Sequence, residues 1–163
     1  MYDYEYGMRE ANVWILVMQT RDAISQLAEK QLSRLGLTPE KFHTLVLCVN
    51  STEPITVAEL GRMLFRKPHT VSGIVNRMEE EGLLKRERLG TQENQGPMHI
   101  SVTDHGTDVY KQGLRIMMRS VARIMERVPK EELEQLDGGL RSLRNSILSE
   151  MNIQPLKITL QLR

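Results

Sequence analysis

The sequence predicts a mainly α-helical protein with one small β-hairpin, and this prediction begins from the middle of its 163 residues. Two short segments are amphipathic, with apolar residues at helical spacing: one opens at Thr56 and is interrupted at Arg66, Lys67 and Pro68, and the next runs from Pro68 to about Gly82. Residues 83–89 and 98–102 read as two strands, and the segment between them is rich in Gly, Asn, Gln and Pro, which favour turns. The expected order is therefore helix, turn, helix and hairpin, with longer helices before and after.

Two helices are expected before this central region. The first covers residues 8–35 and ends near Gly36, and the second begins at Thr38 and Pro39 and extends to about Asn50. The apolar positions are Trp14, Val17, Ile24, Leu27 and Leu35 in the first helix and, facing a core, Phe42, Leu45, Val46 and Val49 in the second.

The two short central helices have recognisable boundary signals. Thr56 and Glu59 have the spacing of a capping box, in which each side chain accepts a hydrogen bond from the other residue's backbone N–H. Pro68 suits the first turn of the second helix, where its missing N–H is not needed. Gly82 stands where a helix C-terminus favours a residue with positive φ. The buried stripe of the second helix is expected to be Val71, Ile74, Val75 and Met78.

The other face of the second helix carries polar residues of kinds that contact DNA. Residues 62–78 contain four Lys or Arg side chains and no Asp or Glu, and Lys85, Arg86 and Arg88 follow on the first strand. A local basic patch is what phosphate neutralisation requires, although the whole chain has a formal net charge of only +1. Taken alone, such a face also fits an ordinary solvated helix, but the helix-turn-helix and wing order favours DNA binding.

Three segments resemble the MarR family of winged-helix bacterial transcription regulators. They are ITVAELGRML, KPHTVSGIVNRMEEEGLLKR and the ISVTDHG that closes the wing, and the general layout is similar from about residue 8 to 150. The resemblance implies a winged helix-turn-helix domain with a helical dimerisation layer. It also implies a homodimeric repressor or activator on a pseudo-palindromic operator, whose DNA affinity a small-molecule or oxidant signal lowers.

One departure from the family concerns the tip of the wing. Relatives carry an Asp-x-Arg pair there, whose Arg enters the minor groove, whereas this chain has Gln92 and Asn94. Arg88 or the amides would have to substitute, so most specificity is expected between Lys67 and Arg77. The residues expected to contact DNA are Arg66, Lys67, His69, Thr70, Ser72, Asn76, Arg77, Arg86 and Arg88. The alternative is a winged helix that docks proteins and binds no nucleic acid.

The chain is expected to divide into four segments. Residues 1–36 form an N-terminal dimerisation helix, 37–106 the winged helix-turn-helix lobe, 107–151 the C-terminal dimerisation helices and 152–163 an extended arm. The C-terminal helices are a long one from Asp104 to about Val128 and a last one after Pro129. In that last helix Leu133, Leu136, Leu140, Leu143 and Ile147 form a seam with strict three- and four-residue spacing.

That seam requires a helical partner, from the same chain or, as the resemblance favours, from a second copy. The arm alternates apolar and polar residues from Leu156 to Leu162, so it is either a disordered end or a strand that packs across the dimer. A small-molecule effector would bind between the lobe and the dimerisation helices. Its expected contacts are Trp14, Met18, Arg21, His43 and Leu47.

Other function classes find little support. Cys48 and His43 are five residues apart on one helix, about 140° around its axis, so they cannot form a nucleophile–base pair. His99 and His105 have no Cys or carboxylate at a metal-ligand spacing, and neither enzyme activity nor a cofactor is expected. The single cysteine is expected to be a buried structural thiol rather than an oxidant sensor. No targeting or membrane segment is recognisable, so a cytoplasmic protein is expected.

Overall fold

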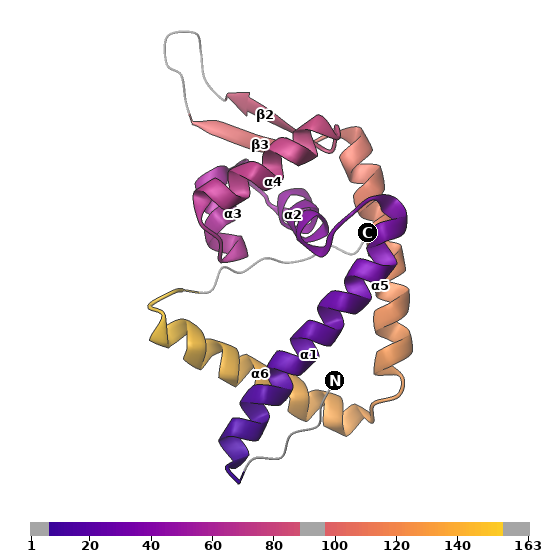
Figure 1. Ribbon diagram of the computed structural model, residues 1–163, viewed down its shortest axis with the longest axis vertical. Coiled ribbons are helices and arrows are strands. Elements are labelled where there is room, and N and C mark those ends of the chain that lie inside the picture. The colour runs from indigo at the N-terminus through magenta and orange to yellow at the C-terminus, as the bar shows by residue number, and fades with distance from the viewer. Residues whose placement is uncertain (1–6, 89–96, 155–163) are drawn as a thin grey trace.

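The computed structural model describes residues 7–88 and 97–154, which form a compact lobe with long helices extending below it (Figure 1). The elements in chain order are α1 (Arg9–Leu32), a 3₁₀ turn (Ser33–Leu35), α2 (Pro39–Asn50), β1 (Ile55–Thr56), α3 (Val57–Leu64), α4 (Pro68–Glu80), β2 (Leu84–Arg88), β3 (Met98–Val102), α5 (Asp104–Met125) and α6 (Lys130–Glu150). The predicted fold class, mainly α with a small β-wing, is therefore confirmed.

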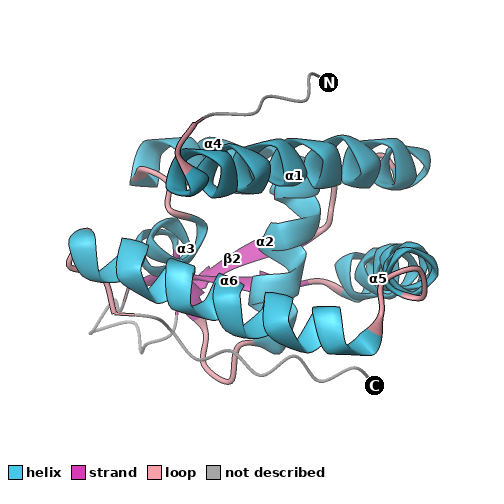
Figure 2. Cartoon of the chain, turned by 90° about the horizontal axis from the view of Figure 1, so that it is seen from below, coloured by secondary structure: helices cyan, strands magenta, loops and turns pink. Residues whose placement is uncertain are grey.

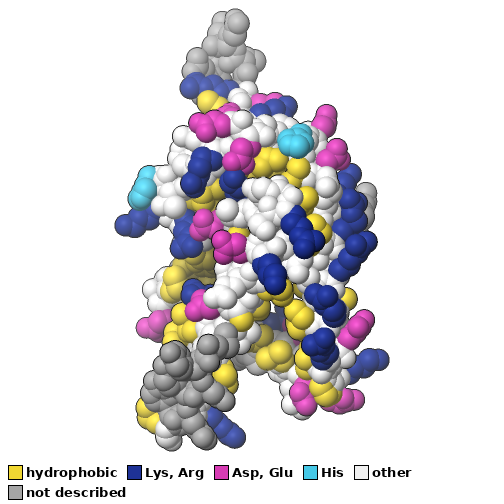
Figure 3. Space-filling view, turned by 45° about the vertical axis from the view of Figure 1, so that its right-hand side comes forward, with side chains coloured by type: hydrophobic (Ala, Val, Ile, Leu, Met, Phe, Trp, Pro, Cys, Tyr) yellow, Lys and Arg dark blue, Asp and Glu magenta, His cyan; other side chains and the backbone are white. Residues whose placement is uncertain are grey.

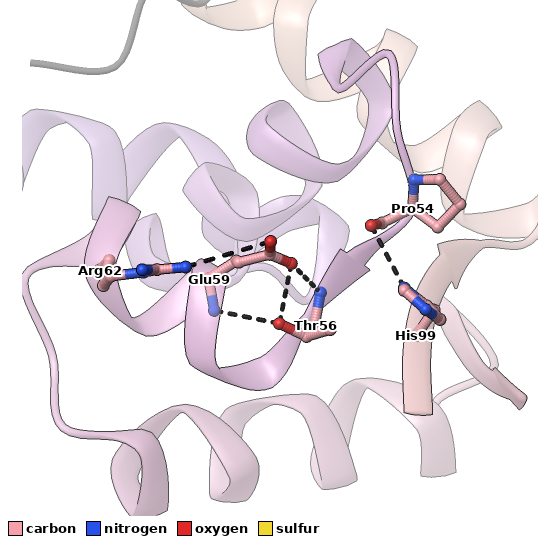
Figure 4. Close-up of polar contacts among 5 residues, drawn as sticks. All are labelled: Pro54, Thr56, Glu59, Arg62 and His99. Atoms are coloured by element: carbon pink, nitrogen blue, oxygen red, sulfur yellow. Dashed lines mark hydrogen bonds and ion pairs between the residues drawn. The ribbon is translucent and has the colours of Figure 1, made fainter. Parts of the chain in front are cut away.

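The local signals at the helix ends act as expected. The Thr56 hydroxyl accepts a hydrogen bond from the Glu59 backbone N–H at 3.2 Å, and the Glu59 carboxylate accepts one from the Thr56 N–H at 2.9 Å (Figure 4). This is the predicted capping box, and it fixes the start of α3. Pro68 is the first residue of α4, and Gly82, which follows the C-cap residue Glu81, has φ of 70°.

The hairpin is part of a three-stranded antiparallel sheet with the order β1-β3-β2. Ile100 in the central strand pairs with Ile55 on one side and Arg86 on the other. The strand Ile55–Thr56 was not predicted, because two residues carry no alternating pattern and their partner lies far along the chain. The predictions for Gln92 and Asn94 and for the alternating arm Leu156–Leu162 lie outside the described residues.

The core lies within the lobe and extends to the adjoining ends of α1 and α5. Its most completely buried side chains are Leu32, Thr44, Leu45, Leu60, Val71, Val75, Met78 and Leu84. Leu32 comes from the last residue of α1, and Tyr110 of α5 stacks on Phe42 of α2 with ring centroids 6.2 Å apart. α1 and α5 are thus anchored in the lobe at one end only.

The far parts of the long helices expose apolar side chains. Figure 2 shows α1 and α6 along opposite sides of the molecule, with α5 seen end-on at one edge. Trp14 and Ile24 of α1 are 51% and 57% exposed, and the α6 seam residues Leu136 and Leu140 are 49% and 44% exposed. Within the described residues no helix of the same chain covers this seam. None of the described helices has both the length and the apolar character that crossing a bilayer requires.

Candidate nucleic-acid interface

The turn between α3 and α4 brings the two helices into close contact. A Cβ on Gly61 would meet the Arg66 carbonyl oxygen at 3.0 Å, and the Arg66 N–H donates to the Gly61 carbonyl at 2.9 Å. Phe65 ends α3 with φ of 53°, a conformation uncommon for a bulky residue. The turn therefore sets α4 across α3, which leaves one side of α4 outside the lobe.

The buried and exposed faces of α4 are those that its sequence predicts. Val71, Ile74, Val75 and Met78 are buried, each at 3% exposure or less. The opposite face carries His69, Thr70, Asn76 and Arg77, all exposed, with Ser72 and Gly73 half-buried among them. This face is polar, rigidly supported from behind and 13 residues long, which suits insertion into a major groove.

The N-terminal end of α4 has features that favour an anion. Its first turn contains no acidic residue and no side chain caps it. The helix dipole and the unpaired N–H groups at such an end favour an anion such as a phosphate. Lys67 directly precedes the helix and, like Arg77, forms no ion pair with any described residue.

The comparisons with known proteins agree with this geometry. Residues 35–93 match the model of the MarR family, and they include α2 through β2 and the turn before α4. Over this segment the chain is similar to the MarR family. It is 25% identical over 134 residues to the organic hydroperoxide resistance transcriptional regulator of Bacillus subtilis (strain 168), covering 82% of this chain and 87% of that protein.

Solved structures of transcription regulators have a similar fold. The ligand-free organohalide-sensing regulator RdhR-CbdbA1625 superposes with a TM-score of 0.76 and 25% identity over 98% of each chain. The same regulator has been solved with 2,4-dichlorophenol bound. The MepR–DNA complex of S. aureus superposes with a TM-score of 0.73 and 21% identity, covering 86% of this chain and 99% of that one.

Several cations expected to face DNA are engaged by carboxylates. Arg66 lies 3.2 Å from Glu40 of α2, and Arg86 lies 2.7 Å from Glu79 of α4. Lys85 also pairs with Glu87 on its own strand. The stretch 62–78 contains no acidic residue, but carboxylates from outside it, those of Glu40 and Glu79, lie close to these cations in space. Contact with DNA phosphates stays a prediction for Arg66, Arg86 and Arg88.

The five residues expected to bind an effector do not meet in one cavity of the described chain. Leu47 is buried in the lobe core, whereas Trp14, Met18 and Arg21 are exposed along α1. Trp14 lies about 27 Å along the helix axis from Leu32, where α1 reaches that core. Desolvation lowers the pKa of His43, which favours its neutral form at pH 7. These residues remain a prediction for the effector site.

A cavity of about 270 Å³ between α1 and α5 was not predicted from the sequence. Its lining residues are Gln31, Arg34, Ile116, Arg119, Ser120 and Arg123. Within the described residues these three arginines form no ion pair, so the cavity has a chemistry that suits an anion. The four-residue spacing of Arg119 and Arg123 was the available signal. Figure 3 shows Lys and Arg side chains lining one side of the molecule, and hydrophobic side chains exposed in its lower half.

A second cavity, of about 380 Å³, lies between the end of α2 and the sheet, and Cys48 lines it together with Glu53, Glu87 and His99. Burial raises the pKa of the Cys48 thiol to about 12. The reactive thiolate is therefore scarce at neutral pH, although Cys48 is half-buried and not fully buried as predicted. Among the described residues no cluster of three His, Cys, Asp or Glu side chains could hold a metal ion.

Proposed function

We propose that this protein is a homodimeric transcription regulator, a repressor, that inserts α4 into the major groove of a pseudo-palindromic DNA operator. The observation that carries the proposal is the exposed polar face of α4, with Lys67 and Arg77 unpaired among the described residues and no acid in its first turn. MepR of S. aureus, which has a similar fold, has been solved in complex with DNA, and this supports DNA binding.

A second copy of the chain would cover the apolar faces that one protomer exposes. Those faces lie on α1, on the end of α5 and on α6, and Leu136, Leu140 and Ile124 are each more than 40% exposed. Apolar side chains gain about 25 cal/mol for each Å² removed from water, so burying them together favours association. In a two-fold dimer the two α4 helices would bind half-sites about 34 Å apart.

We also propose that a small molecule releases this regulator from DNA. RdhR-CbdbA1625, which senses organohalides, is a relative of similar length and fold. The residues proposed for the effector site are Trp14, Met18, Arg21, His43 and Leu47, and the cavity lined by Arg119 and Arg123 is a second candidate for an anionic ligand. An effector would act only through a difference in its affinity for the free and DNA-bound forms.

The decisive experiment selects bound fragments from genomic DNA with the wild-type protein and then measures affinity for the best duplex at fixed salt. Arg77→Ala should weaken binding by about 1–3 kcal/mol if Arg77 contacts a base. Lys30→Ala on α1 removes the same charge away from α4 and should leave binding within about 0.5 kcal/mol. If the two substitutions weaken DNA binding equally, Arg77 does not contact DNA.

The competing function is protein docking without nucleic acid. Binding to random duplex DNA separates the two, because phosphate contacts release counterions and weaken steeply with salt. Absent binding, or a flat response between about 50 and 200 mM salt, would favour docking.

A further inference from the structure

We propose that Arg86 fixes the orientation of Asn76 so that the Asn76 amide presents only N–H donors to DNA, which makes Arg86 a positioning residue for base preference. The inference rests on the proposed function, because it needs α4 in the major groove. It assigns Arg86 a role different from the phosphate contact that its position in the sequence indicates.

Arg86 is held against α4 by contacts with two side chains of that helix. Its Nη1 donates to Glu79 Oε2 at 2.7 Å, and its backbone N–H donates to Glu79 Oε1 at 3.2 Å. Its Nη2 donates to Asn76 Oδ1 at 2.5 Å. The Arg86 side chain is only 21% exposed, and both Glu79 oxygens are occupied by Arg86, so the guanidinium has little freedom to turn away.

The chemistry of the guanidinium decides which way the amide faces. Arginine has five N–H donors and no acceptor, so only the oxygen of the Asn76 amide can face it. Turning the amide over would place Nδ2 against another donor and would lose the hydrogen bond. Asn76 Nδ2 donates to no other described residue, and the residue is exposed, so its two N–H groups are available at the surface.

Asn76 is well placed to reach a base edge. It follows His69 by seven residues and Ser72 by four, so the three side chains lie on one face of α4. The buried residues Val71 and Val75 lie on the other side of the helix. A base that enters this face would meet the two N–H groups of Asn76 and not its carbonyl oxygen.

This orientation has a specific consequence for base preference. An asparagine with both groups free forms a bidentate pair with adenine, accepting from N6 and donating to N7. Asn76 has its acceptor occupied by Arg86, so that pair is not available. Guanine presents two acceptors, N7 and O6, in the major groove, and the two Asn76 donors match them. We therefore expect guanine, not adenine, opposite Asn76 in each half-site.

The experiment compares base preference at every position of the selected operator for wild type and variants. Asn76→Ala identifies the position that Asn76 contacts, and wild type should favour guanine there over adenine by about tenfold or more. The double variant Glu79→Gln with Arg86→Met frees the Asn76 oxygen without changing net charge. It should reduce the guanine preference to less than about twofold or reverse it toward adenine. Lys85→Met on the same strand is the matched control and should keep the preference.

The possible outcomes separate the inference from the function on which it rests. If wild type selects no DNA, the proposed function fails. If DNA binding is intact but the double variant keeps the wild-type preference, or Asn76→Ala changes no position, the inference alone is wrong. Should the double variant not fold, Asn76→Asp at this exposed site replaces the donors with acceptors, which suit cytosine N4. Retained preference for guanine in Asn76→Asp would also overturn the inference.

Discussion

The joint between the wing and α5 depends on the absence of a side chain at Gly106. A Cβ there would lie 2.1 Å from the Leu83 carbonyl oxygen, whereas ordinary contact begins at 3.4 Å. Because the clashing oxygen belongs to the backbone, α5 or the wing must move by on the order of 1 Å to relieve the clash. The Leu83 oxygen accepts hydrogen bonds from the Thr103 N–H at 3.2 Å and hydroxyl at 3.3 Å, and the movement would weaken both.

Gly106→Ala should therefore lower the free energy of unfolding by about 2–4 kcal/mol, from overpacking and from two hydrogen bonds of about 1 kcal/mol each. Gly73→Ala is the matched control, since a Cβ there meets nothing within 4 Å and lies within a helix. It should raise stability by about 0.5–1 kcal/mol. Urea unfolding followed by circular dichroism, at one protomer concentration, measures both. A loss under about 0.5 kcal/mol for Gly106→Ala would refute the clash.

Three further predictions concern other parts of the lobe. Cys48, with its pKa raised to about 12, should react with iodoacetamide at pH 7 more than about 100-fold slower in the native than in the unfolded protein; equal rates would contradict its burial. The Thr56 N–H holds the pKa of the Glu59 carboxyl below its usual range, so the stability it provides is present above about pH 4.3 and lost as pH falls through the folded pKa. Glu59→Gln should thus lose less stability than wild type between about pH 5 and 3 in urea unfolding, and identical losses would exclude the effect. Phe65→Gly should stabilise the protein by about 0.5–1 kcal/mol, because glycine adopts positive φ without steric cost and Phe65 is 58% exposed; a lower thermal midpoint would count against this.

The fold was predictable where its signals act over a few residues. The capping box of Thr56 and the proline at the start of α4 each specify a boundary locally, and both boundaries lie where expected. The strand Ile55–Thr56 is defined by the pairing of Ile55 with Ile100, and no pattern in the neighbouring residues predicts such a long-range contact. The positive φ of Phe65 was not predictable either, because it follows from the close approach of α3 and α4 and not from the residue type.

The candidate site was predictable in its geometry and less so in its charges. The spacing of apolar residues on α4 gave the exposed face correctly. Counting cations along the chain could not show that Arg66 meets a carboxylate 26 residues away or that Arg86 meets one seven residues away. Such pairings change what a cation can do, since a guanidinium already engaged by Glu79 orients a neighbour instead of offering a free positive charge.

The pairing of these cations with carboxylates affects how much of the proposed DNA affinity would come from phosphate contacts and how much from base contacts. If Lys67 and Arg77 make the phosphate contacts, a dimer neutralises about four phosphates, and the logarithm of affinity falls with the logarithm of salt at a slope on the order of −4. That electrostatic contribution is modest, in keeping with a formal net charge of +1. Specific affinity would then depend more on base contacts from a face of fixed geometry, and the Arg86–Glu79 pair is the contact that fixes it beside Asn76.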